Sequence, residues 1–296
     1  MHSRKASKLL AMKAKMQSFL NLKLFLLGFF LLFTVLFVLR PSLQPSSSPQ
    51  GSRPVSSKAF ASTPACTKIP QSLANTVIHY TTSNITPQQT FKEIAVTARV
   101  LEKRSPCNFL VFGLGHDSLM WTALNHGGRT IFLEEDEAWI KSIREKQPSL
   151  EAYHVKYSTK VRDADDLLML GRLPECMAVG DTRFSTCQLA LKELPSVFYE
   201  VDWDVIMVDA PTGYFLDAPG RMAAIYTAGM AARGRREGEV TDVFVHDVNR
   251  VVEDKFSMAF LCEGYLKEQE GRLRHFAIPS HRAANEEKPF CPLMQE

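Results

Sequence analysis

The sequence predicts an α/β fold in which a mostly parallel sheet carries helices on both of its faces. One observation is the apolar run that ends at Phe112 and breaks into the glycine turn 113–115. A second is the run 131–133, which ends in acids about twenty residues after the turn. A third is a pair of short β-branched runs, 205–208 and 243–245, each followed by polar residues. Buried parallel strands consist of such runs, and their carboxyl ends meet at one edge of the sheet, where ligands bind.

The first strand, the turn and the second strand predict a nucleoside-binding unit. Gly113 and Gly115 let the backbone approach an adenosine-type ligand closely, and an acid at the end of the second strand can hold two ribose hydroxyls. A dinucleotide-binding turn has a third glycine, but Ser118 stands at that position. Since nothing then favours a pyrophosphate, the sequence favours S-adenosylmethionine as cofactor and a Rossmann-like S-adenosylmethionine-dependent methyltransferase fold. The alternative is a buried strand with a tight turn; the predicted cofactor residues are Gly113, Gly115, Asp117, Glu134 and Glu135.

Local signals predict the remaining elements. Thr86 is a capping residue followed by a proline and, at Gln89, by the glutamine of a capping box, so we expect a helix to begin here and run through Leu101. Trp121 and Trp139 fall on helices and are predicted to belong to the core. Residues 138–146 predict a helix, 152–157 a third strand, 219–232 a helix and 274–278 a last strand.

The first 64 residues predict a membrane anchor and a stem. Residues 19–39 are almost wholly apolar and would span about 31 Å as a helix. A cleaved signal peptide is the alternative, but the apolar run exceeds the usual length of roughly 7 to 15 residues. The positive-inside rule places residues 1–18 in the cytosol and the rest in the lumen, with 40–64 as a Ser/Pro-rich stem and 65–296 as the luminal domain. No acid occurs in the first 40 residues, whose bases are Arg4, Lys5, Lys8, Lys13, Lys15, Lys23 and Arg40.

Charge and cysteine content limit the partners and the compartment. Taking those seven bases from the total of 35 Lys and Arg leaves 28, against 32 Asp and Glu, so no nucleic-acid partner is expected. An even number of cysteines in a luminal domain favours disulfides, with Cys176 and Cys187 as the most local pair and the remaining connectivity open. Asn84 lies in a glycosylation sequon, and its use is open. The cysteines are Cys66, Cys107, Cys176, Cys187, Cys262 and Cys291.

The polar residues that follow the strands at 205–208 and 243–245 are the catalytic candidates. Asp209, His246 and Asp247 could remove the proton of an acceptor hydroxyl, and a histidine is well suited to such work. Asp209 and Asp247 also offer hard oxygen ligands to a divalent cation. The structural alternatives are a capping carboxylate and a hydrogen-bonded buried histidine. Four residues predicted to lie near or after these strand ends could bind an anionic acceptor, although each alone is more often a surface charge: Arg221, Arg250, His281 and Arg282.

Two other classes of protein compete with a methyltransferase. A glycosyltransferase could use an Asp-x-Asp triplet to hold a metal-bound nucleotide sugar, and such triplets occur at 163–165 and 202–204. The second precedes its strand rather than following it, and the first opens a predicted helix, where acids are favoured in any case. A non-catalytic scaffold of a polysaccharide synthase complex would keep the fold without a base. Binding of the cofactor would separate these classes.

Longer blocks resemble a plant polysaccharide-biosynthesis family that contains glucuronoxylan 4-O-methyltransferases. The resemblance covers about residues 66–291 and implies methylation of O4 on glucuronic acid side chains of xylan, with S-adenosylmethionine as donor and a divalent cation suspected. It also implies a location in the Golgi, so the predicted anchor would make this a single-pass type II protein of the Golgi membrane, with an acidic polysaccharide as substrate and other xylan-synthesis enzymes as candidate partners. The blocks are Asn108–Asp136, Asp202–Phe215, Ala218–Arg233, Thr241–Phe256 and Gly271–Ala283.

The resemblance extends to two sister branches, which leaves alternatives open. One is needed for xylan deposition and shares the blocks around 111–118 and 208–211, but it lacks established catalysis. The other methylates glucuronic acid on arabinogalactan proteins. Residues 125–129 and 280–284 are more similar to the methyltransferase branch, while the choice between xylan and arabinogalactan acceptors is not decided by the sequence.

Overall fold

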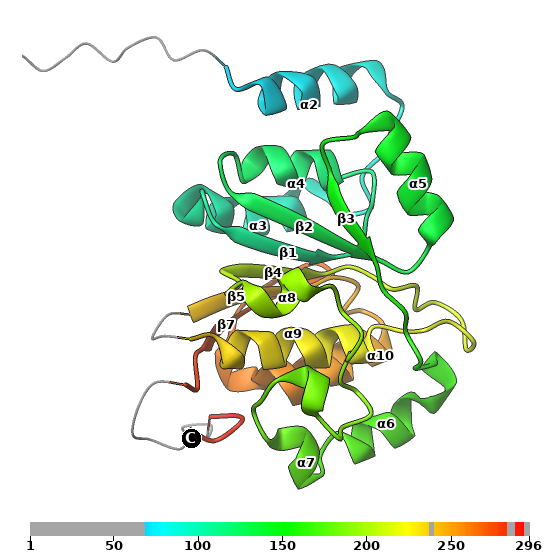
Figure 1. The fold of residues 1–296 in the computed structure, drawn as a ribbon, viewed down its shortest axis with the longest axis vertical. Coiled ribbons are helices and arrows are strands. Elements are labelled where there is room, and N and C mark those ends of the chain that lie inside the picture. Colours follow the sequence, from blue (N-terminus) through cyan, green and yellow to red (C-terminus); the bar gives the residue numbers. More distant parts are fainter. Residues whose placement is uncertain (1–68, 237–239, 283–287, 293–296) are drawn as a thin grey trace, which may run out of the picture. The chain divides into compact units, whose positions relative to one another are not determined.

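The computed structural model describes residues 69–236, 240–282 and 288–292 (Figure 1). All of them belong to one unit, Cys66–Glu296. The predicted basic tail, anchor and stem fall on residues 1–64 and so lie outside the described residues. Within the described ranges, no helix has both the length and the apolar character needed to cross a membrane.

A seven-stranded sheet in the order β3-β2-β1-β4-β5-β7-β6 organises this unit. The first five strands are parallel, and β7 runs antiparallel to both of its neighbours, which confirms the predicted mostly parallel sheet. The order reverses between β1 and β4, and a crevice opens at the carboxyl ends of such strands. The strands are β1 (Asn108–Phe112), β2 (Arg129–Glu134), β3 (Glu151–His154), β4 (Val205–Val208), β5 (Val240–Val245), β6 (Leu266–Glu270) and β7 (Leu273–Pro279).

Helices cover both faces of the sheet (Figure 1). One face packs against α3 (Phe91–Arg104), α4 (Ser118–Leu124) and α5 (Glu137–Lys146), with α2 (Gln71–Thr82) in contact with α4. The other face packs against α6 (Ala164–Leu170), α7 (Pro174–Met177), α8 (Ser196–Glu200), α9 (Met222–Gly234) and α10 (Val251–Phe256). A π-helical turn, Ser257–Cys262, continues α10, and short 3-10 turns occur at Val161–Asp163, Thr182–Phe184 and Glu263–Tyr265.

The alternation of side chains along β1 divides the core into two layers. Phe109 and Val111 pack with α3, α4 and α5, whereas Leu110 and Phe112 pack with α9. Successive side chains of a strand point to opposite faces, so a strand buried on both faces must be apolar throughout. Trp121 is 1% exposed and lies in the first layer, as predicted.

The capping box of α3 lies four residues later than predicted. Thr90 Oγ1 accepts a hydrogen bond from the backbone N–H of Glu93 at 3.3 Å, and Glu93 Oε2 accepts one from the N–H of Thr90 at 2.6 Å. The sequence offers the same pattern at 86–89 and at 90–93, and a glutamate in the box also complements the helix dipole. Residues 86–89 instead form an irregular segment before the helix.

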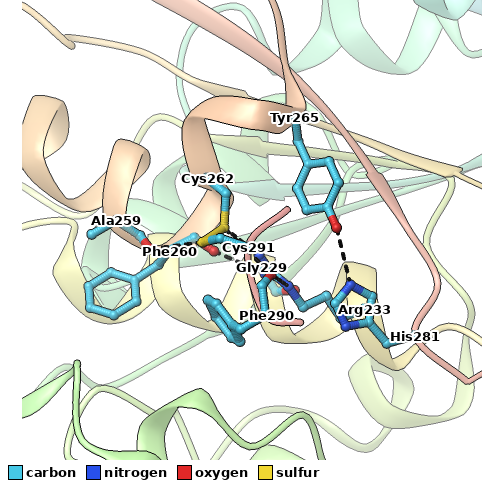
Figure 2. The surroundings of a disulfide bond; sticks show 9 residues. All are labelled: Gly229, Arg233, Ala259, Phe260, Cys262, Tyr265, His281, Phe290 and Cys291. Atoms are coloured by element: carbon cyan, nitrogen blue, oxygen red, sulfur yellow. Dashed lines mark hydrogen bonds between the residues drawn. A yellow bond between two sulfur atoms is a disulfide. The ribbon is translucent and has the colours of Figure 1, made fainter. Parts of the chain in front are cut away.

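Two disulfides close loops on the α9 side of the sheet. Cys176–Cys187 confirms the predicted local pair, and Cys262–Cys291 joins the π-helical turn to the C-terminal segment (Figure 2). Cys107 is buried as a free thiol. Burial raises the pKa of Cys107 to about 11, so it remains a protonated thiol at neutral pH.

A buried arginine stands beside the second disulfide. Arg233 of α9 is 0% exposed and donates hydrogen bonds to the carbonyls of Phe290, Phe260 and Gly229 at 3.1, 2.9 and 3.0 Å (Figure 2). Its guanidinium also lies 3.8 Å from the centre of the Phe290 ring. Burial lowers its pKa to about 10. We call this arrangement of Arg233, Phe290 and the Cys262–Cys291 disulfide the C-terminal clasp.

Candidate active site

A cleft of about 780 Å³ opens at the carboxyl ends of β1, β2, β4 and β5. It is the crevice expected where the strand order of an open sheet reverses. Nine of the twelve predicted site residues line it, so the polar residues predicted to converge after the strands do lie together at this cleft. These nine are Gly113, Gly115, Asp117, Glu134, Glu135, Asp209, Arg221, Asp247 and Arg250.

The glycine turn closes on the neighbouring strand. Gly113 has a φ of +124°, which residues with a side chain rarely adopt, and a Cβ atom there would crowd the Cβ of Ala210 at 3.1 Å. The N–H of Gly115 donates to Ser118 Oγ at 3.0 Å. The serine at the place of a third glycine therefore fixes the turn, and Gly113, Leu114 and Gly115 line the cleft.

Two glutamates at the end of β2 face the cleft in different ways. Glu134 accepts hydrogen bonds from the N–H groups of Leu114 and Asp136 at 2.9 and 3.0 Å. Burial, with the charge of Glu135 in addition, raises the pKa of Glu134 to about 7. Glu135 Oε1 accepts from the N–H of Thr212 at 2.8 Å, while its buried Oε2 has no hydrogen-bond partner among the described residues. An acceptor without a donor beside a glycine turn fits the ribose hydroxyls of S-adenosylmethionine.

Two tryptophans and Asp117 complete this end of the cleft. Asp117 Oδ2 accepts from Trp121 Nε1 at 2.8 Å, and burial together with the charge of Asp209 raises the pKa of Asp117. Trp139 Nε1 donates to the carbonyl of Leu114 at 2.5 Å. The prediction that Trp139 belongs to the core is only partly right, because it is half-buried and lines the cleft.

Asp209 is the carboxylate at the centre of the cleft. Its Oδ1 lies 2.9 Å from His246 Nδ1 and 3.3 Å from Arg221, and its Oδ2 accepts from Gln89 Nε2 at 3.1 Å. Burial raises the pKa of Asp209, but the hydrogen bond from His246 and the charge of Arg221 outweigh burial, so the pKa lies below its usual value. Asp209 is therefore ionised where the cleft meets the sheet. Nothing in the local sequence around Gln89 indicated its part in this contact.

His246 lies behind Asp209 rather than in the cleft. Its side chain is 0% exposed, and its Nε2 lies 3.8 Å from Glu93 Oε2, without a hydrogen-bond partner in the described part of the chain. A fully buried imidazole does not reach an acceptor hydroxyl, so the predicted direct proton transfer does not fit this placement. His246 instead orients the carboxylate of Asp209.

Asp247 is the centre of a group of arginines. It has a φ of +62° and a side chain that is 3% exposed, and its carboxylate pairs with Arg221 at 2.9 Å, Arg250 at 3.0 Å and Arg272 at 2.8 Å. Arg272 was not predicted because it lies on the turn between β6 and β7, far from Asp247 in sequence. Arg221, buried between Asp209 and Asp247, is committed to these carboxylates. Arg250 is a third exposed and lines the cleft, so of the pair Arg221 and Arg250 it is Arg250 that can also reach a ligand.

The three donors of Asp209, His246 and Asp247 lie within 4.8 Å of one another, which is the spacing of a metal site. The guanidinium of Arg221 already pairs with both carboxylates, and His246 Nδ1 is bonded to Asp209. A divalent cation carries the same sign of charge as the arginine and needs the same oxygens. With Arg221 in this position, the donor set does not fit a cation.

His281 and Arg282 lie near the amino ends of the parallel strands, on the side of the sheet opposite the cleft, contrary to the prediction. Val245 pairs with Arg274 and Val240 with Pro279, because β7 is antiparallel to β5. Residues that follow β7 therefore emerge beside the amino ends of the parallel strands. The N–H of His281 donates to the carbonyl of Arg233, and Arg282 lines a separate pocket of about 100 Å³.

The chain is similar to known proteins over most of its length. The sequence profile of the family described as IRX15/IRX15L/GXM matches residues 92–276, which include most of the cleft. The chain is 66% identical over 242 residues to glucuronoxylan 4-O-methyltransferase 1 of Arabidopsis thaliana, covering 81% of this chain and 86% of that protein. It is 52% identical over 213 residues to arabinogalactan O-methyltransferase 2 of the same plant, covering 71% and 72%. It is 41% identical over 217 residues to protein IRX15-LIKE, covering 71% and 68%.

Proposed function

Because the chain belongs to the IRX15/IRX15L/GXM family, we propose that it transfers a methyl group from S-adenosylmethionine to O4 of glucuronic acid side chains of glucuronoxylan. The observation that carries the proposal is the 66% identity to a glucuronoxylan 4-O-methyltransferase over more than four fifths of the chain. Identity falls to 52% for an arabinogalactan O-methyltransferase and to 41% for IRX15-LIKE, so the xylan acceptor is favoured over both alternatives. The glycosyltransferase alternative is not supported.

The cofactor fits the end of the cleft formed by β1 and β2. The backbone of Gly113–Gly115 allows close approach, and the free Oε2 of Glu135, beside Glu134, accepts ribose hydroxyls. S-adenosylmethionine supplies a methyl group bonded to a positively charged sulfur, which an oxygen nucleophile displaces in line. The protein must therefore hold the acceptor oxygen in alignment and receive its proton.

Asp209 and Arg250 are the residues proposed to act on the acceptor. The Arg250 guanidinium pairs with the carboxylate of glucuronic acid. The O4 hydroxyl donates a hydrogen bond to Asp209, and its proton passes to this carboxylate as the new carbon–oxygen bond forms. The low pKa of Asp209 keeps it ionised, and Arg221 and His246 hold it in place.

The proposal is tested with the full chain, S-adenosylmethionine labelled in the methyl group, and glucuronoxylan. We expect label on O4 of glucuronic acid, located by mass spectrometry of the released side chains. Arabinogalactan protein is the matched alternative acceptor and should receive little label. Labelling of arabinogalactan alone, or of neither polymer, would contradict the proposed function.

Binding of a divalent cation is a separate proposal. Such a cation would compete with the Arg221 guanidinium for the carboxylates of Asp209 and Asp247. A cation that bound Asp209 and Asp247 would have to replace this guanidinium. Arg221→Gln should therefore raise the affinity for Mn²⁺ above that of the wild type, as measured by calorimetry, and adding Asp247→Asn should remove the gain. Equal affinities in wild type and Arg221→Gln would count against a cation at these carboxylates.

The proposed location is the Golgi membrane, with a cytosolic tail, one anchor at 19–39, a stem and a luminal catalytic domain. Two disulfides in the described residues support an oxidising compartment. In sealed microsomes a C-terminal tag should be protected from protease and an N-terminal tag digested. The reverse pattern would overturn this topology. Other xylan-synthesis enzymes are proposed partners, to be sought by co-purification from the same membranes.

A further inference from the structure

Three consecutive apolar side chains are exposed at the lip of the cleft. Tyr214 is 76% exposed, Phe215 48% and Leu216 66%, and the two aromatic residues line the cleft. Isolated exposed apolar residues are common, whereas an adjacent group at the rim of a site indicates contact with a ligand. The two rings meet edge to face, with centres 5.1 Å apart.

The backbone of this loop is fixed. The carbonyl of Leu216 accepts from the N–H of Arg162 at 3.0 Å, and that of Ala218 from the N–H of Val161 at 2.9 Å. Thr159 Oγ1 donates to the carbonyl of Pro219 at 2.9 Å. These bonds tie the loop to the segment before α6, so the aromatic rings are held outward by a defined backbone.

The loop also lies against the arginine proposed to hold the acceptor. A Cβ atom at Gly213 would lie 2.9 Å from Glu253 Oε1 and 3.8 Å from a terminal nitrogen of Arg250. A side chain at position 213 would crowd the carboxylate of Glu253. The aromatic pair begins at the next residue, so the charged and the apolar parts of the cleft wall adjoin.

We propose that Tyr214 and Phe215 form a platform for the neutral backbone sugars of the polysaccharide, beside the glucuronic acid held by Arg250. The inference rests on the proposed function and deepens it. A pyranose ring presents apolar C–H groups on its faces, and aromatic side chains offer large apolar surfaces with a polar rim. The platform carries no charge, and its neighbour Arg250 carries one, which matches an acidic branch on a neutral chain. The enzyme then recognises the neutral backbone of the polysaccharide as well as its glucuronic acid side group.

The test compares Tyr214→Ala/Phe215→Ala with Phe184→Ala, which removes an aromatic ring that is 81% exposed away from the cleft. The acceptors are glucuronoxylan polymer and the smallest xylose unit that bears glucuronic acid. For the double variant we expect KM for the polymer to rise about ten-fold, with kcat for either acceptor and KM for the small one little changed. Tyr214→Trp/Phe215→Trp should restore a low KM, and Phe184→Ala should resemble the wild type.

A binding measurement separates failure of the platform from failure of the proposed function. Electrophoresis through a gel that contains unsubstituted xylan needs no turnover and no glucuronic acid. Retardation of the wild type and of Phe184→Ala, but not of the double alanine variant, would support the platform even without methylation. Equal retardation of all three, or an equal rise of KM for both acceptors, would overturn it.

Discussion

Asp209 is one end of a buried polar line that continues through His246 to Glu93. Only Asp209 of the three reaches the cleft, since His246 and Glu93 are 0% and 1% exposed. The ionised carboxylate thus has a fixed orientation before any acceptor binds, which lowers the cost of aligning it with a hydroxyl.

Asp209→Asn should lower kcat by about 10²- to 10⁴-fold, because the amide does not accept the proton of the hydroxyl. Affinity for S-adenosylmethionine should stay near that of the wild type, since Asp209 is proposed to act on the acceptor hydroxyl. Single-turnover kinetics and calorimetry measure the two quantities, with the exposed Asp163→Asn as control. Normal turnover in Asp209→Asn would move proton acceptance to another residue.

We expect the affinity for the cofactor to depend on pH through Glu134. Its pKa of about 7 means that much of the free protein carries a protonated Glu134 near neutrality, whereas ribose hydroxyls that donate to this pair favour the ionised form. Affinity for S-adenosylmethionine should therefore rise by roughly ten-fold from pH 6 to pH 8. Calorimetry in buffers of different ionisation enthalpy should detect release of a proton on binding.

Two variants check this assignment. Glu134→Gln should make the affinity independent of pH over this range. Glu135→Gln removes a negative neighbour that raises the pKa of Glu134, so the midpoint should move to lower pH. An unchanged midpoint in Glu135→Gln, or a persisting slope in Glu134→Gln, would assign the titration to a different group.

At the level of elements, the sequence indicates where a strand or helix lies along the chain better than it indicates the direction in which that element runs in the sheet. The glycine turn and the acids of β2 were predicted because strand, turn and helix follow one another locally. The burial of His246 depends on Glu93 of α3, which comes from a different part of the chain. The direction of β7 is not encoded in its apolar pattern, so His281 and Arg282 were placed at the wrong edge. β6 was not predicted, because Leu266–Glu270 is a mostly polar edge strand.

The contribution of the C-terminal clasp to stability can be tested at Arg233 of α9. Arg233→Met keeps an unbranched apolar side chain but leaves buried carbonyls of Phe260 and Phe290 without their donor, at a cost of about 1 to 3 kcal/mol each, offset in part because a buried charge is removed. The urea midpoint should fall clearly, whereas Arg236→Met, at an exposed site, should change stability by roughly 0.5 kcal/mol or less. Equal midpoints for the two variants would show that the clasp adds no stability.

At the level of the whole molecule, the Cys262–Cys291 disulfide closes a loop with a sequence separation of 29. Replacing both cysteines by serine should lower the free energy of unfolding by roughly 3 to 4 kcal/mol. Affinity for S-adenosylmethionine below the transition should be unchanged, because the clasp and the cleft lie at opposite edges of the sheet. As a control, reductant should destabilise Cys107→Ala as much as the wild type, because the free thiol of Cys107 takes no part in a disulfide. A cofactor affinity that fell with the disulfide would show that the two edges are coupled.

Because β7 runs antiparallel to β5, the C-terminal segment lies near the amino ends of the parallel strands and the cleft at their carboxyl ends. The two regions can therefore change independently in evolution. Because Phe290 and Cys291 lie beside α9 at the edge remote from the cleft, substitutions in this segment can accumulate without contact with the acceptor. The loop at 211–219, in turn, can change its aromatic residues without disturbing the clasp. We expect duplicated copies of such a chain to acquire new polysaccharide acceptors through that loop while they inherit the same clasp.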